Sequence, residues 1–213
     1  MRIDVFTLVP HAFAWLTEQR PLAAVLGGEL DLRLFSYRDT TPLRAAQVDD
    51  EPYGGGAGMV LRVDVVAAAL DAVYGGAPTH RVVALSPQGR PLTQAVIEEL
   101  AQEDTVTLLS ARFEGFDERV VQHLASDAIS IGPYVLSNGD LPAMVVLDAI
   151  ARRLPGALAA GSGELESFSD ELGGGLEYPH YTRPAEFRGW KVPDVLLSGD
   201  HARIETWRRE GIR

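Results

Sequence analysis

Short apolar strands alternate with helical segments over the first 150 residues, and this alternation restricts the possible folds more than any other feature. The predicted strands are residues 2–8, 30–37, 81–85, 105–109 and 127–130. Helical periodicity is predicted at residues 13–19, 21–26, 63–73, 93–101, 117–124 and 143–153. Three of the strands are continuous apolar runs, typical of strands covered on both faces. The pattern therefore predicts a parallel α/β sheet packed between helices.

Composition excludes several classes of protein. The chain has 213 residues and no Cys, so disulfides, thiol catalysis and Cys-based metal sites are excluded. The five His residues are scattered without metal-ligand spacing, and we predict no metal site. No apolar run approaches the roughly 18 residues of a membrane span. The first residues also lack the basic region and cleavage site of a signal peptide, so the prediction is a cytoplasmic protein without a membrane partner.

Charge is distributed unevenly along the chain. The net charge is −11, which argues against a strongly basic nucleic-acid-binding protein, and no DNA partner is predicted. Residues 179–213, in contrast, hold seven basic and five acidic residues. The basic residues are therefore mildly concentrated towards the C-terminus, and a solvated helix face would also account for them.

The amino-acid composition changes after Pro155. Six Gly residues lie between positions 156 and 175, which favours a flexible linker. Ser198 is then predicted to cap a helix over residues 200–210. We therefore expect a main domain at residues 1–155, a linker at 156–178 and a small helical lobe at 179–213.

Three turn-rich segments follow the carboxyl ends of predicted strands, at residues 86–90, 110–115 and 131–142. Ligands of open α/β sheets bind at that edge, so these loops are expected to form one pocket. The longest of them runs from Ser130 to Met144 and contains the turn-prone pairs Gly132-Pro133 and Asn138-Gly139. A plain strand-to-helix connection would be the structural alternative.

A glycine run, EPYGGGAGM, occupies residues 51–59. It lacks the Lys-Ser/Thr of a phosphate-binding P-loop and the G-x-G-x-x-G spacing of a dinucleotide site. These absences argue against a nucleoside triphosphatase and a nicotinamide enzyme. The run is either a flexible loop or a bare backbone surface for a flat ligand such as a base.

Six motifs occur in one order across nearly the whole chain: VDDEPYGGGAGM, LSPQGRPL, ARFEGFDERV, SIGPYVLSNGDLPAM, PHYTRP and VPDVLLSGDHARIETWRRE. Together they resemble the bacterial tRNA (guanine-N1)-methyltransferase family, TrmD. The resemblance implies a SPOUT-type fold with a deep trefoil knot, S-adenosylmethionine as methyl donor and dependence on Mg²⁺. It also implies a homodimer with shared sites, acting on the tRNA guanosine just 3′ of the anticodon.

The resemblance assigns roles residue by residue. The implied cofactor-binding residues are Leu85, Ser86, Ala111, Phe113, Glu114, Gly115, Ile131, Gly132, Pro133, Tyr134, Val135, Leu136, Asn138, Gly139 and Pro142. The implied substrate-binding residues are Gly58, Met59, Ser167, His180 and Arg183. Arg152 and Glu166 would be catalytic. Guanine N1 carries a proton that a base must remove, which suits Glu166, and an Arg can stabilise the resulting charge on the neighbouring oxygen.

The sequence departs from the family pattern at several positions. Glu166 stands where the family has Asp, Ala111 and Phe113 replace a Gly and a Tyr, and Asn138 replaces a Gly. The chain also stops at Arg213, before a further helical stretch of its relatives. Two alternatives follow: another knotted RNA methyltransferase with a different target nucleotide, or an RNA-binding protein that has lost catalysis.

Overall fold

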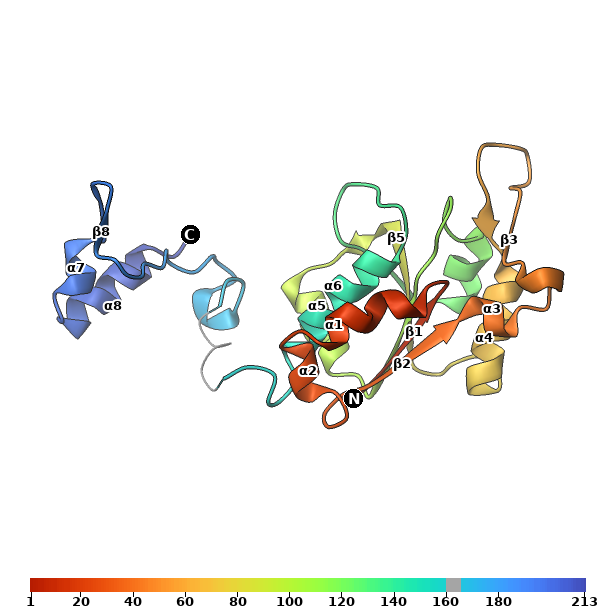
Figure 1. The fold of residues 1–213 in the computed structure, drawn as a ribbon, viewed down its shortest axis with the longest axis horizontal. Coiled ribbons are helices and arrows are strands. Elements are labelled where there is room, and N and C mark those ends of the chain that lie inside the picture. Colours follow the sequence, from red (N-terminus) through yellow and green to blue (C-terminus); the bar gives the residue numbers. More distant parts are fainter. Residues whose placement is uncertain (160–165) are drawn as a thin grey trace. The chain divides into compact units, whose positions relative to one another are not determined.

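The computed structural model describes residues 1–159 and 166–213 of the chain (Figure 1). They divide into two compact units, Met1–Leu158 and Ala159–Arg213. Among the described helices, none has the length and apolar character needed to cross a membrane.

A five-stranded parallel sheet organises the first unit, which confirms the predicted parallel α/β sheet. Its strands are β1 (Arg2–Thr7), β2 (Asp31–Ser36), β5 (Arg81–Pro91), β6 (Thr105–Leu109) and β7 (Asp127–Ser130). They lie in the order β2-β1-β6-β5-β7, and every neighbouring pair is parallel. Because all strands run the same way, the loops that follow β5, β6 and β7 meet at one edge.

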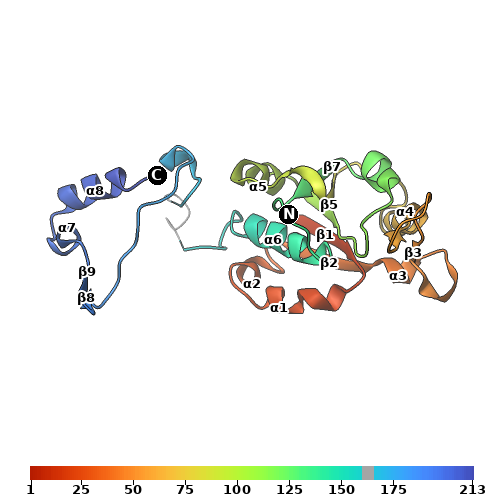
Figure 2. The ribbon, with the colours of Figure 1, turned by 90° about the horizontal axis from the view of Figure 1, so that it is seen from above.

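Helices cover both faces of this sheet (Figure 2). One layer contains α1 (Ala14–Thr17), α2 (Leu22–Val25), α5 (Gln94–Ala101) and α6 (Asp140–Ala151); the other contains α3 (Tyr37–Thr40), α4 (Val63–Tyr74) and the π-helix η3 (Val120–Leu124). Successive strand side chains point to opposite layers. Val5 accordingly packs in the first core and Phe6 in the second.

Shorter elements connect these layers. They are η1 (Pro10–Phe13), η2 (Arg44–Ala46) and the antiparallel pair β3 (Asp49–Asp50) and β4 (Val60–Leu61). The pair β3–β4 carries the glycine run at its tip. Residues 51–59 are therefore a hairpin loop that stands out from the unit (Figure 1).

Two helix starts show how the sequence sets helix boundaries. The Thr93 hydroxyl accepts a hydrogen bond from the Val96 amide, so Thr93 caps α5 as predicted. Helix α6 begins at Asp140, three residues before the predicted start. The prediction was wrong because it treated Pro142 as part of the loop, whereas the first turn of a helix tolerates a Pro without an amide donor.

Strand β5 departs from the prediction that residues 86–90 form a loop. The strand continues to Pro91, but Leu85 and Arg90 both lie opposite Ile129 of β7. Residues 86–89 therefore bulge out of the ladder before pairing resumes. The return brings Gly89 against the backbone of Ala128 and Ile129, where any Cβ would overlap main-chain atoms. Only Gly fits this close approach of two backbones.

The second unit mixes short strands and helices. It contains the 3₁₀ turn η4 (Asp170–Leu172), the hairpin β8 (Glu186–Phe187) and β9 (Trp190–Lys191), and the helices α7 (Asp194–Leu197) and α8 (His201–Glu210). Asp200, rather than Ser198, caps α8, because its carboxylate accepts from the Arg203 amide. The Ser198 hydroxyl instead donates to the Val195 carbonyl at the end of α7.

The stretch expected to be a linker carries local structure at both ends. Ala157 is buried in the core of the first unit. In the second unit, the Phe168 amide donates to the Gly175 carbonyl at 2.7 Å, and Leu176 and Arg213 exchange two backbone hydrogen bonds. The segment that begins at Glu166 is therefore tied to the end of the chain.

Candidate functional site

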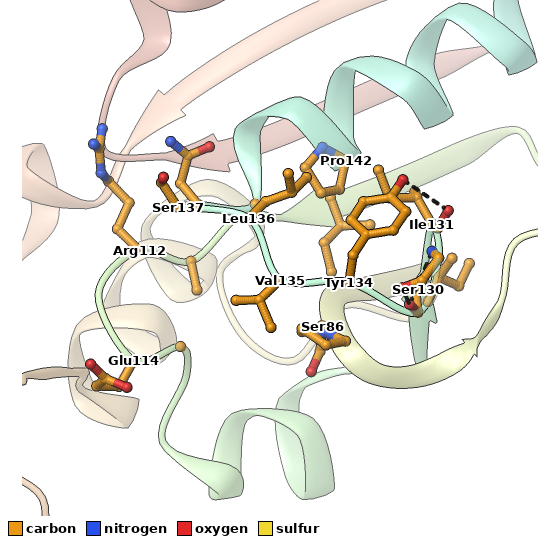
Figure 3. Close-up of a pocket in the computed structure, with 18 of the residues that line it drawn as sticks. Ser86, Arg112, Glu114, Ser130, Ile131, Tyr134, Val135, Leu136, Ser137 and Pro142 are labelled. Atoms are coloured by element: carbon orange, nitrogen blue, oxygen red, sulfur yellow. Dashed lines mark hydrogen bonds between the residues drawn. The ribbon is translucent and has the colours of Figure 1, made fainter. Parts of the chain in front are cut away.

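One pocket lies at the carboxyl edge of the sheet, where the segments after β5, β6 and β7 converge (Figure 3). It holds about 610 Å³ of open space, counted to its mouth. Its lining residues come from all three of these segments. The expectation that three separate loops form one pocket is therefore met.

The structure places 14 of the 15 predicted cofactor-binding residues around this pocket. They are Leu85, Ser86, Ala111, Phe113, Glu114, Gly115, Ile131, Gly132, Tyr134, Val135, Leu136, Asn138, Gly139 and Pro142. Pro133 is the exception among the predicted residues. Sequence reasoning missed five further lining residues: Pro87, Arg112, Ile129, Ser130 and Ser137. Pro87, Arg112 and Ser137 lie within the three loops expected to form the pocket, and Ile129 and Ser130 directly precede the third loop, so proximity in the sequence was the available signal.

The pocket wall is largely apolar, with one charge of each sign. Leu85, Ile131 and Leu136 contribute aliphatic surface. Glu114 and Arg112 are the two charged side chains among the lining residues, and both lie at the same side of the pocket in Figure 3. Such a wall suits a ligand with a flat apolar part and a charged end.

Short backbone contacts fix the loops after β6 and β7 against each other. The Gly139 amide donates to the Ala111 carbonyl at 2.7 Å, and Arg112 pairs with Asn138 as an antiparallel bridge. A Cβ on Gly139 would approach the Ala111 nitrogen and the Ser110 Cα to 3.0 Å. The glycine therefore permits this close approach.

The tip of the loop after β7 is fixed by hydrogen bonds of its own. The Ser130 hydroxyl donates to the Gly132 carbonyl at 3.0 Å, and the Tyr134 hydroxyl donates to the Ile131 carbonyl at 3.3 Å (Figure 3). Tyr134 and Val135 nevertheless remain exposed. The loop thus holds a defined shape while presenting apolar side chains to the pocket mouth.

The glycine run meets the pocket at Glu114. The Glu114 amide donates to the Met59 carbonyl at 2.9 Å. Gly58 has a φ of +81°, and a Cβ there would overlap the Glu114 side chain. The structure therefore brings the predicted substrate residues Gly58 and Met59 beside the second pocket loop.

The remaining predicted residues fall in two places. Arg152 follows the last turn of α6 and is half-buried in the first unit. Glu166, Ser167, His180 and Arg183 belong to the second unit. Within the second unit, the Ser167 hydroxyl accepts from the Glu177 amide at 3.1 Å, and the Glu177 carboxylate lies 3.0 Å from His180 Nε2.

The fit of these residues to a metal ion can be tested directly. Among residues 1–159 and 166–213, no three His, Asp or Glu side chains are grouped closely enough to hold one. Glu114 is the sole carboxylate among the residues that line the pocket. The described residues therefore do not by themselves fit a Mg²⁺ ion.

Comparisons with known proteins identify the family. The family model described as tRNA (Guanine-1)-methyltransferase TrmD matches residues 1–213. A protein of Brevibacillus brevis is 49% identical over 216 residues, covering 100% of this chain and 87% of the relative. One of Geobacter metallireducens is 51% identical over 211 residues, covering 98% and 85%. Both are named tRNA (guanine-N(1)-)-methyltransferase. The chain belongs to the tRNA (guanine-1)-methyltransferase family TrmD.

Proposed function

We propose that this protein transfers a methyl group from S-adenosylmethionine to N1 of the tRNA guanosine just 3′ of the anticodon. Membership of the TrmD family supports the reaction. The observation that carries the proposal is the pocket itself, because it is built from the three loops that the family resemblance assigns to the cofactor. The finer elements of the proposal follow from the residues around it.

The pocket suits S-adenosylmethionine chemically. Its aliphatic wall, with Leu85, Ile131 and Leu136, can hold the flat adenosine. The Glu114 carboxylate can attract the positive charge of the sulfonium or amino group, and the Arg112 guanidinium can bind the methionine carboxylate. When bound, the cofactor supplies an electrophilic methyl group, and the protein residues of the pocket bind and orient it.

Proton removal is assigned to Glu166. Guanine N1 carries a proton at neutral pH, so its lone pair becomes available only when a base takes that proton. The Glu166 carboxylate would accept it as the bond from N1 to the methyl carbon forms and the bond from that carbon to the donor sulfur breaks, with the electron pair of the broken bond left on the sulfur. Relatives use Asp in this role, and a Glu reaches about one methylene further.

Charge stabilisation is assigned to Arg152. Loss of the N1 proton places negative charge on the adjacent guanine oxygen. A guanidinium group can donate hydrogen bonds to this oxygen. These bonds strengthen as negative charge develops on the oxygen, so they stabilise the transition state. Arg152 directly follows α6, whose first turn adjoins the pocket at Gly139. One helix therefore connects Arg152 to the pocket.

Recognition of tRNA is assigned to two regions. Gly58 and Met59 present bare backbone beside Glu114, where a flat base can approach. Ser167, His180 and Arg183 would contact the RNA from the second unit. Its basic residues at 179–213 are the part of an otherwise acidic chain that best attracts phosphates.

A homodimer with sites shared between subunits is also proposed. Leu141 and Val145 are exposed apolar residues of α6, 54% and 45% accessible, and they lie one turn apart on one helix face. Arg152 follows at helical spacing on the same side. A second subunit seated on this stripe would cover the apolar residues and approach Arg152.

The variant Val145→Asp tests this interface. A buried, unpaired carboxylate disfavours association, so we expect light scattering to give the monomer mass and methyl transfer to fall with it. Ala72→Asp, an equally acidic change at an exposed position of α4, is the matched control and should remain dimeric. A dimer that persists in Val145→Asp would place the interface elsewhere.

The knot and the cellular setting belong to the same proposal. After the edge strand β7 the chain returns across the sheet, since the Asn138 region pairs with Arg112 after β6. That return supports the trefoil knot implied by the family. A cytoplasmic location fits a tRNA substrate. Dependence on Mg²⁺ is carried by the family resemblance alone.

Nucleoside analysis tests the reaction. Bulk tRNA incubated with the protein and S-adenosylmethionine should yield 1-methylguanosine when digested and measured by mass spectrometry. A ribose-methylated or different base product would favour another knotted RNA methyltransferase. Cofactor binding without any methylated product would favour an RNA-binding protein that has lost catalysis.

A further inference from the structure

Asp140 is a buried carboxylate directly behind the pocket. It is the first residue of α6 and is 3% exposed. Its Oδ1 atom accepts hydrogen bonds from the hydroxyls of Thr7 and Ser110, both at 2.6 Å. Thr7 ends β1, and Ser110 follows β6. One oxygen atom therefore joins the start of α6 to the ends of two strands.

The same carboxylate connects the two loops that form most of the pocket wall. Ser110 precedes Ala111, and Asp140 follows Gly139, so both bonded residues are one peptide from the pocket. The Gly139 amide donates to the Ala111 carbonyl, and the Asp140 amide donates to the Asn138 side-chain oxygen at 3.0 Å. The hydrogen bond between Ser110 and Asp140 thus joins the same two loops directly behind their backbone contacts.

A carboxylate at this position is costly. Within the described part of the chain, the second oxygen of Asp140 is buried and has no hydrogen-bond partner, and the same holds for the Tyr37 hydroxyl. Burial first, and then the charge of Asp140, raise the pKa of Tyr37 well above its ordinary value, so the phenol keeps its proton. Incompletely satisfied buried groups are expected where function requires them.

We infer that Asp140 is a positioning residue that fixes the loops 110–115 and 131–139 at the separation needed to bind S-adenosylmethionine. The inference rests on the proposed function. Asp140 itself is not among the residues that line the pocket. It acts through the backbone groups of Ala111 and Gly139, whose placement it holds before the ligand arrives.

Its two hydroxyl partners separate this role from general stabilisation. Ser110 leads into a pocket loop, whereas Thr7 leads into the segment of Val9, which does not line the pocket. Ser110→Ala removes the link between the pocket loops. Thr7→Val removes an equally short bond, 2.6 Å in both cases, that reaches only β1.

The experiment measures two quantities for each variant. Calorimetry gives the Kd for S-adenosylmethionine at a temperature well below the melting point of the variant, and a separate thermal scan gives its melting temperature. We expect Ser110→Ala and Asp140→Ala to weaken binding about tenfold or more, as loss of a hydrogen bond to a charged group implies. Asp140→Asn keeps an acceptor oxygen and should lose less affinity than Asp140→Ala. Thr7→Val should lower the melting temperature and leave the Kd unchanged.

Asp4→Asn is a further control. Asp4 is also fully buried and lies in β1 three residues before Thr7, where Arg33 and Tyr74 bind its carboxylate at 2.7 Å. Its variant should be less stable with unchanged affinity. If the wild-type protein binds S-adenosylmethionine and Ser110→Ala has the same Kd, the inference about Asp140 is overturned while the proposed function stands. A wild-type protein that binds no S-adenosylmethionine would overturn the proposed function, and the inference with it.

Discussion

Glu166→Gln is expected to lower the rate of methyl transfer by about 100-fold or more, the usual contribution of a general base. Gln keeps the length and shape of Glu but cannot accept the N1 proton. Binding of S-adenosylmethionine should be unchanged, since the pocket is formed by loops of the first unit. The measurement is single-turnover methyl transfer to tRNA beside calorimetric binding of the cofactor.

Two neighbouring carboxylates make this result specific. Glu171→Gln introduces the same chemical change five residues along the chain, and we expect a nearly normal rate. Asp170→Asn tests the nearest alternative base. Near-normal turnover in Glu166→Gln, with a large loss in Asp170→Asn, would move the base role to Asp170 and contradict the assignment.

Arg152→Ala is expected to have the second large effect, a fall of about 100-fold in kcat. The lost guanidinium is proposed to stabilise charge that appears only as the N1 proton leaves, so kcat should fall more than KM rises. Arg152→Lys keeps the charge but loses the planar fork, and an intermediate rate is expected. Steady-state kinetics with tRNA as the varied substrate measures both constants.

Arg153 provides the matched control for that change. It is the next residue, and its guanidinium lies 3.4 Å from the Glu98 carboxylate of α5. Arg153→Ala should therefore cost some stability and little rate. If Arg152→Ala raised KM alone, Arg152 would bind tRNA without a part in the chemical step.

The sequence predicted the fold where local rules decide the structure. Continuous apolar runs correctly indicated buried parallel strands, and Thr93 marked the start of α5. The prediction was wrong where a contact between residues far apart in the sequence decides the local structure. Residues 86–89 bulge because the chain must return opposite Ile129, and no local signal at Gly89 reveals that partner. Asp200 replaced Ser198 as a cap because two adjacent helices share the intervening turn.

The pocket was predicted more completely than the groups behind it. All of its lining residues except Ile129 lie in three continuous motifs, so order along the chain was enough to group them. Asp140 was missed as a functional residue, although it belongs to one of those motifs. Its partners Ser110 and Thr7 are 30 and 133 residues away in sequence, and only the folded sheet brings their hydroxyls to one oxygen.

Methyl transfer to a matched pair of tRNA transcripts tests the central claim most directly. The first transcript carries guanosine just 3′ of the anticodon, and the second carries adenosine there and is otherwise identical. With labelled S-adenosylmethionine, the account predicts label in the first transcript only. Equal label in both would contradict it, because the methylated nucleotide would then lie elsewhere in the tRNA.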